Sequence, residues 1–388
     1  MNKNSYLKFL YPLILIVLLA FSCYFLYHYT FYKTPIGSHM DNILLGIKDL
    51  SIFFIFIIAS YSIGIKLLKL FLFNLKSCLH ELFLALGIGF SFYYILALLI
   101  TCLHILSVPL LWVTLIIPII FALKELANLF YNCINKYSLQ IDFINSFLFL
   151  LFLFYFICAL CPPCGTDSLI YHLVMPQECL EHGGIPNSFS TIHCHLPSAM
   201  SMLYLYLMGL GSDFLPQLLH YSFFLFICGL SYINIKNLFS SKVAKYTILL
   251  FACEFPIVQH GIQVANIDFH TCFYSLASLF ILINIFCSKD KNYSDNKKNW
   301  IILSGIFLAI AMSSKYTAYQ SLIATEVLLI ILILYKKLSF RFYCLFNIVT
   351  FVTFSPVLIK NCVYTGDPLF WLLSKNLQIY NIIPKDIF

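Results

Sequence analysis

The stretch CPPCGTDSLIYHL, residues 161–173, brings several chemically capable side chains together directly after a long apolar run. Asp167 has two readings. Its carboxylate could cap a short helix running to Pro176, or it could act as a base toward a bound substrate. On a helix, Tyr171 lies four residues after Asp167 and on the same face, with His172 beside it. Capping and chemistry do not exclude one another.

A second carboxylate repeats this arrangement. Asp268 stands in VANIDFHTCFYSLASLF, at the start of another apolar run. Ionisable side chains at the border of a membrane segment are costly to keep and are often functional. The alternative is again a cap, here for the helix that Phe269 begins.

Two lysines stand apart from the other basic residues. Lys315 lies in SSKYTA and Lys360 in SPVLIKNCVYTGDP, each at the end of an apolar run. One reading is that both side chains extend from apolar surroundings to the membrane interface. The other is that the two ammonium groups hold an anion such as a phosphate.

The elements that position these residues must be membrane helices. The chain has 388 residues, of which 61% are hydrophobic and 10% charged, and its mean hydropathy is +0.91. A soluble domain of this length could not bury so much apolar surface. We therefore predict an all-α, polytopic integral membrane protein with about eleven transmembrane helices. The net charge of +7 is spread along the chain, with no basic patch for nucleic acid.

The spans are expected where apolar runs approach the length of a membrane helix. They lie near residues 10–29, 49–66, 82–104, 107–123, 143–161, 216–235, 246–261, 269–287, 300–315, 318–335 and 342–360.

The basic residues predict the orientation of these spans. They cluster in alternate connections, at Lys66 to Lys76, Lys124 to Lys136, Lys236 to Lys245, Lys289 to Lys298, and Lys336 to Arg341. Positive loops remain in the cytoplasm, so these clusters are expected there. No lysine or arginine occurs between Lys136 and Lys236, and residues 161–217 are therefore expected to form a large extracytoplasmic loop. Within it, residues 198–211 are apolar but too short to span, which predicts an interfacial or re-entrant helix.

Five stretches resemble one known family when they are taken in order. They are GTDSLIYHLVMPQECLEHGGIP, HCHLPSAMSMLYLYLMGLGSDFLPQLLHYSF, VANIDFHTCFYSLASLF, SSKYTA and SPVLIKNCVYTGDPLF. Together they are similar to membrane glycosyltransferases of the GT-C superfamily, in the branch of glycosyltransferase family 39 that includes aminoarabinose and protein mannosyl transferases. The resemblance runs from about residue 155 to residue 370.

The resemblance implies a function and a set of site residues. Such enzymes move a sugar from a polyprenyl-phosphate carrier to a lipid, glycan or protein acceptor outside the membrane, with inversion. Carried over, the catalytic acids fall on Asp167, as the base, and on Asp268. The substrate-binding set falls on Tyr171, His172, His195, Lys315, Tyr316, Lys360 and Asn361. Relatives usually carry Arg at the position of Lys360.

The same resemblance implies how the chain is organised and where it works. Residues 1–142 would form N-terminal transmembrane helices, and residues 143–388 a GT-C-like catalytic membrane region. The expected location is a bacterial inner membrane, with the site on the extracytoplasmic side. No cofactor is expected, although a divalent metal stays open.

Two alternatives remain at this level. Cys161 and Cys164, with His193 and His195, could bind zinc, or the cysteines could form a disulfide, or all four could be unpaired. The rival function is a polytopic transporter or lipid-binding protein without catalysis. Transporters typically show repeated halves and charges at mid-membrane, whereas here the acids lie at the ends of apolar runs and no internal repeat is visible.

Overall fold

The computed structural model describes residues 37–70, 77–136, 142–254, 264–287 and 291–370, and within these ranges it is helical without strands. The expected span at 10–29 lies outside the described residues. The longer helices are α2 (Gly37–Leu70), α3 (Cys78–Cys102), α4 (Val108–Phe121), α5 (Leu123–Lys136), α6 (Phe143–Ala159), α9 (Leu215–Leu238), α11 (Asp268–Cys287), α13 (Lys297–Ser314), α14 (Tyr319–Leu334) and α15 (Phe340–Thr365). The shorter helices are η1 (Ser168–His172), α7 (Val174–Glu181), η2 (Ile192–His195), α8 (Ala199–Leu210), α10 (Ser241–Ala252), α12 (Lys291–Asp295) and η4 (Tyr316–Ala318).

The described part of the chain contains six helices that are long and apolar enough to cross a membrane, or seven if α4 and α5, bent by 65°, form one span. The multi-pass membrane prediction is confirmed at this level. The number eleven is not confirmed and stays a prediction. Three expected spans are not among these six helices: α6 is a shorter apolar helix, α10 has 12 residues, and α13 begins with two lysines.

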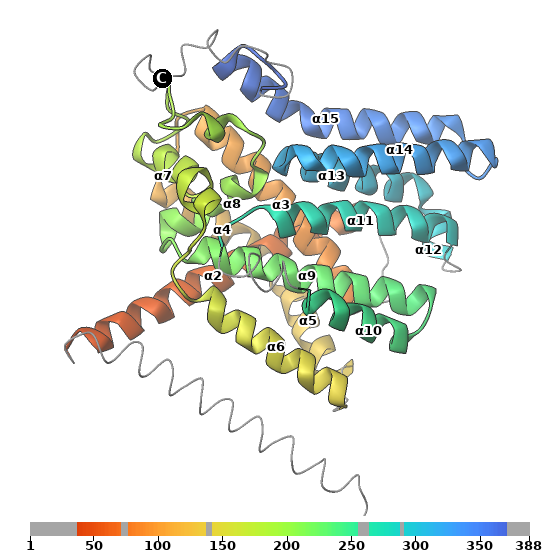
Figure 1. The fold of residues 1–388 in the computed structure, drawn as a ribbon, viewed down its shortest axis with the longest axis horizontal. Coiled ribbons are helices and arrows are strands. Elements are labelled where there is room, and N and C mark those ends of the chain that lie inside the picture. The colour runs from red at the N-terminus through yellow and green to blue at the C-terminus, as the bar shows by residue number, and fades with distance from the viewer. Residues whose placement is uncertain (1–36, 71–76, 137–141, 255–263, 288–290, 371–388) are drawn as a thin grey trace, which may run out of the picture.

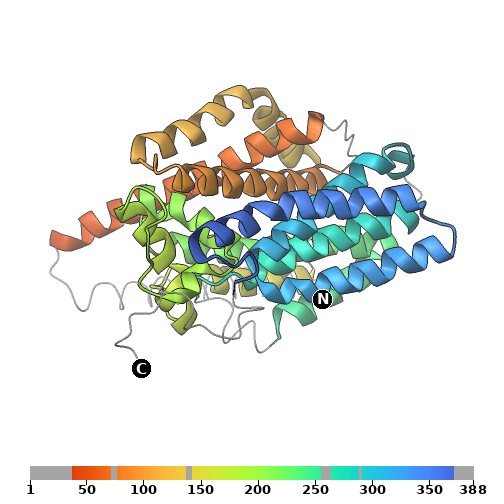
Figure 2. The same ribbon diagram turned by 90° about the horizontal axis from the view of Figure 1, so that it is seen from above.

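The long helices run side by side (Figures 1 and 2). The two ends of the bundle carry different residues. Helices α7 and α8 lie at one end, with η1 and η2 between α6 and α8 in the chain. We call this the loop end. The turn between α14 and α15, with Lys336 and Lys337, and the start of α13 lie at the other, which we call the lysine end.

Helices α2 and α3 approach each other closely because glycines face the partner backbone. A Cβ on Gly64 would lie 1.8 Å from the Ala85 carbonyl oxygen, and a Cβ on Gly89 would lie 1.8 Å from that of Ser60. Small residues at such crossings allow the van der Waals contact that associates helices in lipid. This close pair forms one wall of the bundle.

Aromatic rings pack in the centre of the bundle, and apolar side chains also lie on its outer surface. Phe56, Tyr93 and Tyr206 join α2, α3 and α8 with ring centroids 5.2 to 5.6 Å apart. The exposed apolar side chains lie mainly on α2, α4, α6, α14 and α15, as expected for helices that face lipid. Helix α8 was expected to be interfacial or re-entrant. It is almost entirely buried, and therefore it lies within the bundle.

The expected division at residue 142 is not tested by the fold. Helix α3, from the first part, packs against α8, α9 and α13 from the second. Helices from both parts thus share one core. The predicted site residues lie at the loop end, where the helices of this shared core end.

Candidate active site

Asp167 lies in the connection between α6 and η1, and its carboxylate is exposed. Its backbone is helical, with φ −63° and ψ −38°, and its side chain makes no capping hydrogen bond. The neighbouring Gly165 allows close approach of another segment, because a Cβ there would lie 2.8 Å from Val264 Cγ1. The loop end therefore brings Asp167 near the chain that leads to Asp268, with its carboxylate available.

Tyr171 lies beside Asp167, as the four-residue spacing predicted. Burial raises the pKa of Tyr171 above its usual range, and the neighbouring carboxylates of Asp167 and Asp268 raise it further. The Tyr171 ring stacks on His193, with centroids 5.3 Å apart. The phenol thus remains protonated at ordinary pH and can donate a hydrogen bond next to both acids.

Asp268 begins α11, and it pairs with the lysine that follows α13. Lys315 Nζ lies 2.6 Å from Asp268 Oδ1, and the two side chains are 32% and 52% exposed. Lys315 has an extended backbone, with φ −156° and ψ 140°, where α13 ends. Both groups therefore stay within reach of a ligand. The structure brings together two residues that the sequence separates by 47 positions.

His172 lies under this group of charges. Its Nδ1 is 3.2 Å from Ser201 Oγ of α8, and its side chain is buried. Burial lowers the pKa of His172 to about 3, with a further contribution from the Lys315 charge. The imidazole is therefore neutral at ordinary pH, and it can position η1 against α8 without adding charge.

A hydrogen bond that the sequence reasoning missed lies directly beneath the ion pair. His270 Nδ1 is 2.7 Å from Ser314 Oγ, and both side chains are fully buried. Ser314 Oγ also donates to the Ile310 carbonyl oxygen at 2.8 Å. A hydroxyl has one proton, so His270 Nδ1 must be the donor to Ser314. The only sequence signal is adjacency, since His270 follows Asp268 by two residues and Ser314 directly precedes Lys315.

Lys360 belongs to a second, more deeply buried group. Its side chain is 7% exposed, and its Nζ donates to the His195 carbonyl oxygen at 3.2 Å. Burial, with the nearby Lys360 charge, lowers the pKa of His195 to about 4. Asn361 is fully buried, and its side-chain oxygen and nitrogen have no hydrogen-bond partner among the described residues. These unpaired amide atoms are available to a ligand or an ordered water.

Tyr316 connects the two groups. It follows Lys315, and its hydroxyl donates to the Phe370 carbonyl oxygen. The Phe370 ring contacts His195, with centroids 5.5 Å apart. Gly366 makes this return of the chain possible, because it ends α15 with φ +74°, a conformation that favours glycine. The seven predicted binding residues and two acids thus fall into two neighbouring groups, centred on Lys315 and on Lys360.

The cysteine and histidine pairs do not form a shared centre in the structure. Cys161 and Cys164 form no disulfide, whereas His193 stacks on Tyr171 and His195 contacts Phe189. Across the ranges that the structure describes, no group of three or more His, Cys, Asp or Glu side chains could hold a metal ion. The geometry favours none of the zinc and disulfide alternatives for this loop.

Comparison with known proteins gives one family match. Residues 197–359 match the model of the dolichyl-phosphate-mannose-protein mannosyltransferase family. The match covers less than half of the chain and supports a GT-C glycosyltransferase-like protein. The matched region contains α8 to α14 and most of α15, including Asp268 and Lys315, while Asp167 and Lys360 lie outside it. No match was found among curated proteins or solved structures. With its several apolar helices, this glycosyltransferase-like chain is an integral multi-pass membrane protein.

Proposed function

We propose that this protein transfers a sugar from a polyprenyl-phosphate carrier to an acceptor hydroxyl at the loop end. One observation supports it most directly. The family match contains the exposed Asp268–Lys315 pair, and the exposed carboxylate of Asp167 lies in the same group through Tyr171. Two acids, a cation and a phenol in one group suit transfer of a sugar from a phosphate leaving group.

The chemistry assigns a role to each charged residue. Asp167 accepts the proton of the acceptor hydroxyl while its oxygen attacks the anomeric carbon. The bond from that carbon to the phosphate oxygen breaks, and the electron pair leaves with the polyprenyl phosphate. Lys315 neutralises the departing phosphate, and Lys360 contributes a second positive charge from the neighbouring group. A single displacement inverts the anomeric centre. The acceptor is a lipid, glycan or protein.

The surrounding residues hold the sugar rather than react. Tyr171 donates a hydrogen bond from its protonated hydroxyl, and neutral His172 keeps η1 on α8. Asp268 orients Lys315 and accepts a sugar hydroxyl. His195, Tyr316 and Asn361 line the approach from the Lys360 side. Across the described residues no group suits a metal ion, and the proposed steps need none.

The test is transfer by purified protein in detergent, with a polyprenyl-phosphate sugar and a hydroxyl acceptor. Asp167→Asn should lower turnover about 10²- to 10⁴-fold because an amide cannot accept the proton. Asp213→Asn, at another exposed carboxylate between α8 and α9, is the matched control and should keep turnover. Wild-type turnover in folded Asp167→Asn protein would reject the base. A transporter or lipid-binding protein would release no polyprenyl phosphate in this assay.

The site is proposed to face the extracytoplasmic side, because the basic residues gather at the lysine end. Cysteines introduced at exposed Asn187 and exposed Lys298 should react with an impermeant thiol reagent from opposite sides of sealed cells or vesicles. Asn187→Cys should be labelled from outside. Labelling of both from one side would contradict this orientation.

A further inference from the structure

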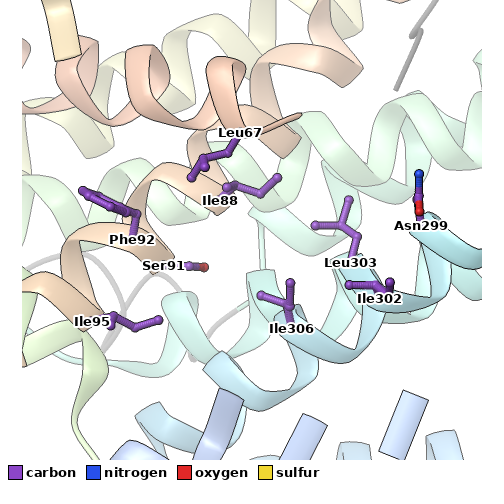
Figure 3. A pocket seen from close by; sticks show the side chains of 9 residues that line it. All are labelled: Leu67, Ile88, Ser91, Phe92, Ile95, Asn299, Ile302, Leu303 and Ile306. Atoms are coloured by element: carbon purple, nitrogen blue, oxygen red, sulfur yellow. The ribbon is translucent and has the colours of Figure 1, made fainter. Parts of the chain in front are cut away.

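Helix α5 turns away from the helix before it and is tied to the end of α2. The axes of α4 and α5 differ by 65°. Leu67, in the last turn of α2, lines one cavity with Asn299, in the first turn of α13 (Figure 3), so α2 ends at the lysine end. Lys66 and Lys69 of α2 donate to Glu125 Oε1 of α5 at 3.0 Å and 2.9 Å. The first turn of α5 is therefore held level with the last turn of α2, where that apolar helix ends.

The described side chains of α5 divide its surface into three sides. The buried and half-buried side chains lie on the side toward α2 and α3: Glu125, Leu126, Leu129 and Asn132. Exposed apolar side chains recur at spacings of four and three residues and so share a second side: Leu123, Ala127 and Phe130. Exposed polar side chains share the third side: Lys124, Asn128 and Asn135. A helix with one apolar and one polar exposed side suits the border between hydrocarbon and water.

The apolar side of α5 continues the lipid-facing surface of α4. Ile117, Ile120 and Phe121 are exposed at the end of α4, and on α5 Leu123 is exposed and Phe130 is 72% exposed. An exposed apolar surface on a membrane helix faces lipid. Because this surface runs from α4 directly into the first turn of α5, the same lipid covers the apolar side of α5.

The charges at α5 favour a particular kind of lipid. Lys66, Lys69 and Lys124 hold three positive charges around the single negative charge of Glu125. Tyr131 is exposed at the border between the apolar and polar sides, and tyrosine is enriched where a membrane meets water. Basic side chains at this depth attract the headgroups of anionic phospholipids. The surface of α5 therefore matches an anionic leaflet in both its apolar side and its charge.

We propose that α5 lies in the headgroup layer of the leaflet at the lysine end and binds anionic phospholipid there. Leu123 and Phe130 enter the border of the acyl chains, and Lys124 pairs with a headgroup phosphate. Through Glu125 this contact fixes the last turn of α2 at the membrane surface. Helices α4 and α5 are then not two parts of one span. The inference concerns a helix outside the matched region 197–359 and does not depend on sugar transfer.

Fluorescence quenching measures the depth of α5 in the full chain, in nanodiscs of phosphatidylcholine and phosphatidylglycerol. A coumarin amino acid replaces Phe130, Asn128 or Val352 in turn. Val352, exposed in the middle of α15, is the reference for the hydrocarbon centre. Position 130 should be quenched best by a lipid nitroxide next to the headgroup, and position 128 by aqueous iodide. Position 352 should be quenched best by a nitroxide near the end of the lipid chain.

Three results would overturn the position of α5. Best quenching of position 130 by the nitroxide near the chain end would place α5 inside a span. Quenching of position 130 by iodide alone would place this side of α5 in water. Protection of position 130 from both kinds of quencher would show that a protein, or a second copy of this chain, covers it.

A second measurement tests the anionic phospholipid. Quenching of position 130 by the nitroxide next to the headgroup should rise about twofold when phosphatidylglycerol replaces part of the phosphatidylcholine, because Lys124 draws α5 toward the headgroups. Lys124→Gln should abolish this rise. Lys242→Gln is the matched control, because it removes an exposed lysine from α10 instead, and it should keep the rise. No rise in the wild-type protein, or an equal loss in both variants, would overturn the binding of anionic phospholipid by α5.

Discussion

Replacing Lys315 by Met separates a phosphate-binding lysine from a lysine that merely forms an ion pair. Met keeps the length and apolar stem of the side chain and removes its charge. Lys315 Nζ lies 2.6 Å from Asp268 Oδ1, with the two side chains 32% and 52% exposed. An ion pair this open contributes about 0.2–1 kcal/mol to stability, since water and salt screen it. The thermal midpoint of the variant should therefore change little.

Binding of the donor should change much more. A charge-assisted contact to phosphate is worth about 1.5–3 kcal/mol, which corresponds to about ten- to hundredfold in donor affinity. The assay is the donor concentration dependence of transfer in proteoliposomes, with the thermal midpoint measured on the same preparation. Lys66→Met is the matched control, because Lys66 also forms an ion pair, 3.0 Å from Glu125 Oε1, and is 41% exposed. It should leave the donor dependence unchanged.

Two outcomes would refute the reasoning. An unchanged donor dependence in folded Lys315→Met protein would leave Lys315 as an ion-pair partner of Asp268 only. An equal loss in Lys66→Met would show a general effect of charge on the membrane protein. Lys360 is a less direct probe, because its replacement by Met also leaves the buried His195 carbonyl oxygen without its donor, at about 1–3 kcal/mol of stability. Lys360→Arg keeps the charge and should retain donor use.

Two further predictions follow from the buried histidines. Ser314→Ala removes the hydrogen-bond partner of His270, which should loosen the Asp268–Lys315 pair and lower turnover about tenfold at an unchanged KM for the sugar acceptor. Ser304→Ala is the control, because it removes a similar buried hydrogen bond between α11 and α13. Both variants should lose about 1–3 kcal/mol of stability, but Ser304→Ala should keep its turnover. Equal turnover in the two serine variants would show no special role for Ser314. Because burial lowers the pKa of His172 to about 3, the unfolded state binds more protons below pH 6.5, so stability should fall as the pH falls from 6.5 toward 3. His172→Asn should make this dependence of the thermal midpoint on pH less steep, while the similarly lowered pKa of His195 keeps part of it. His182→Asn, at an exposed side chain, should leave the slope unchanged. An unaltered slope in His172→Asn would contradict the assignment.

Much of the fold could be predicted because membrane helices satisfy their own hydrogen bonds. In lipid every backbone group must find a partner within the segment, so a long apolar run has few structures available to it. The runs at 49–66, 82–104, 216–235 and 269–287 correspond to α2, α3, α9 and α11. The short apolar stretch at 198–211 shows the limit of this reasoning. Its length excluded a span, but whether α8 lies at the surface or inside depends on helices that pack around it.

The sequence by itself determined that this protein lies in a lipid membrane, that it is helical, and that Asp167 lies beside Tyr171. These follow from composition and from helical periodicity, which act over a few residues. Only the tertiary structure decided that Asp268 meets Lys315, that His270 meets Ser314, and that Lys360 is buried against His195. These partners are 44 to 165 residues apart, and their meeting depends on which helix faces touch. In lipid that choice rests on shape, as at Gly64 and Gly89, rather than on hydrophobicity, because all the long helices are apolar.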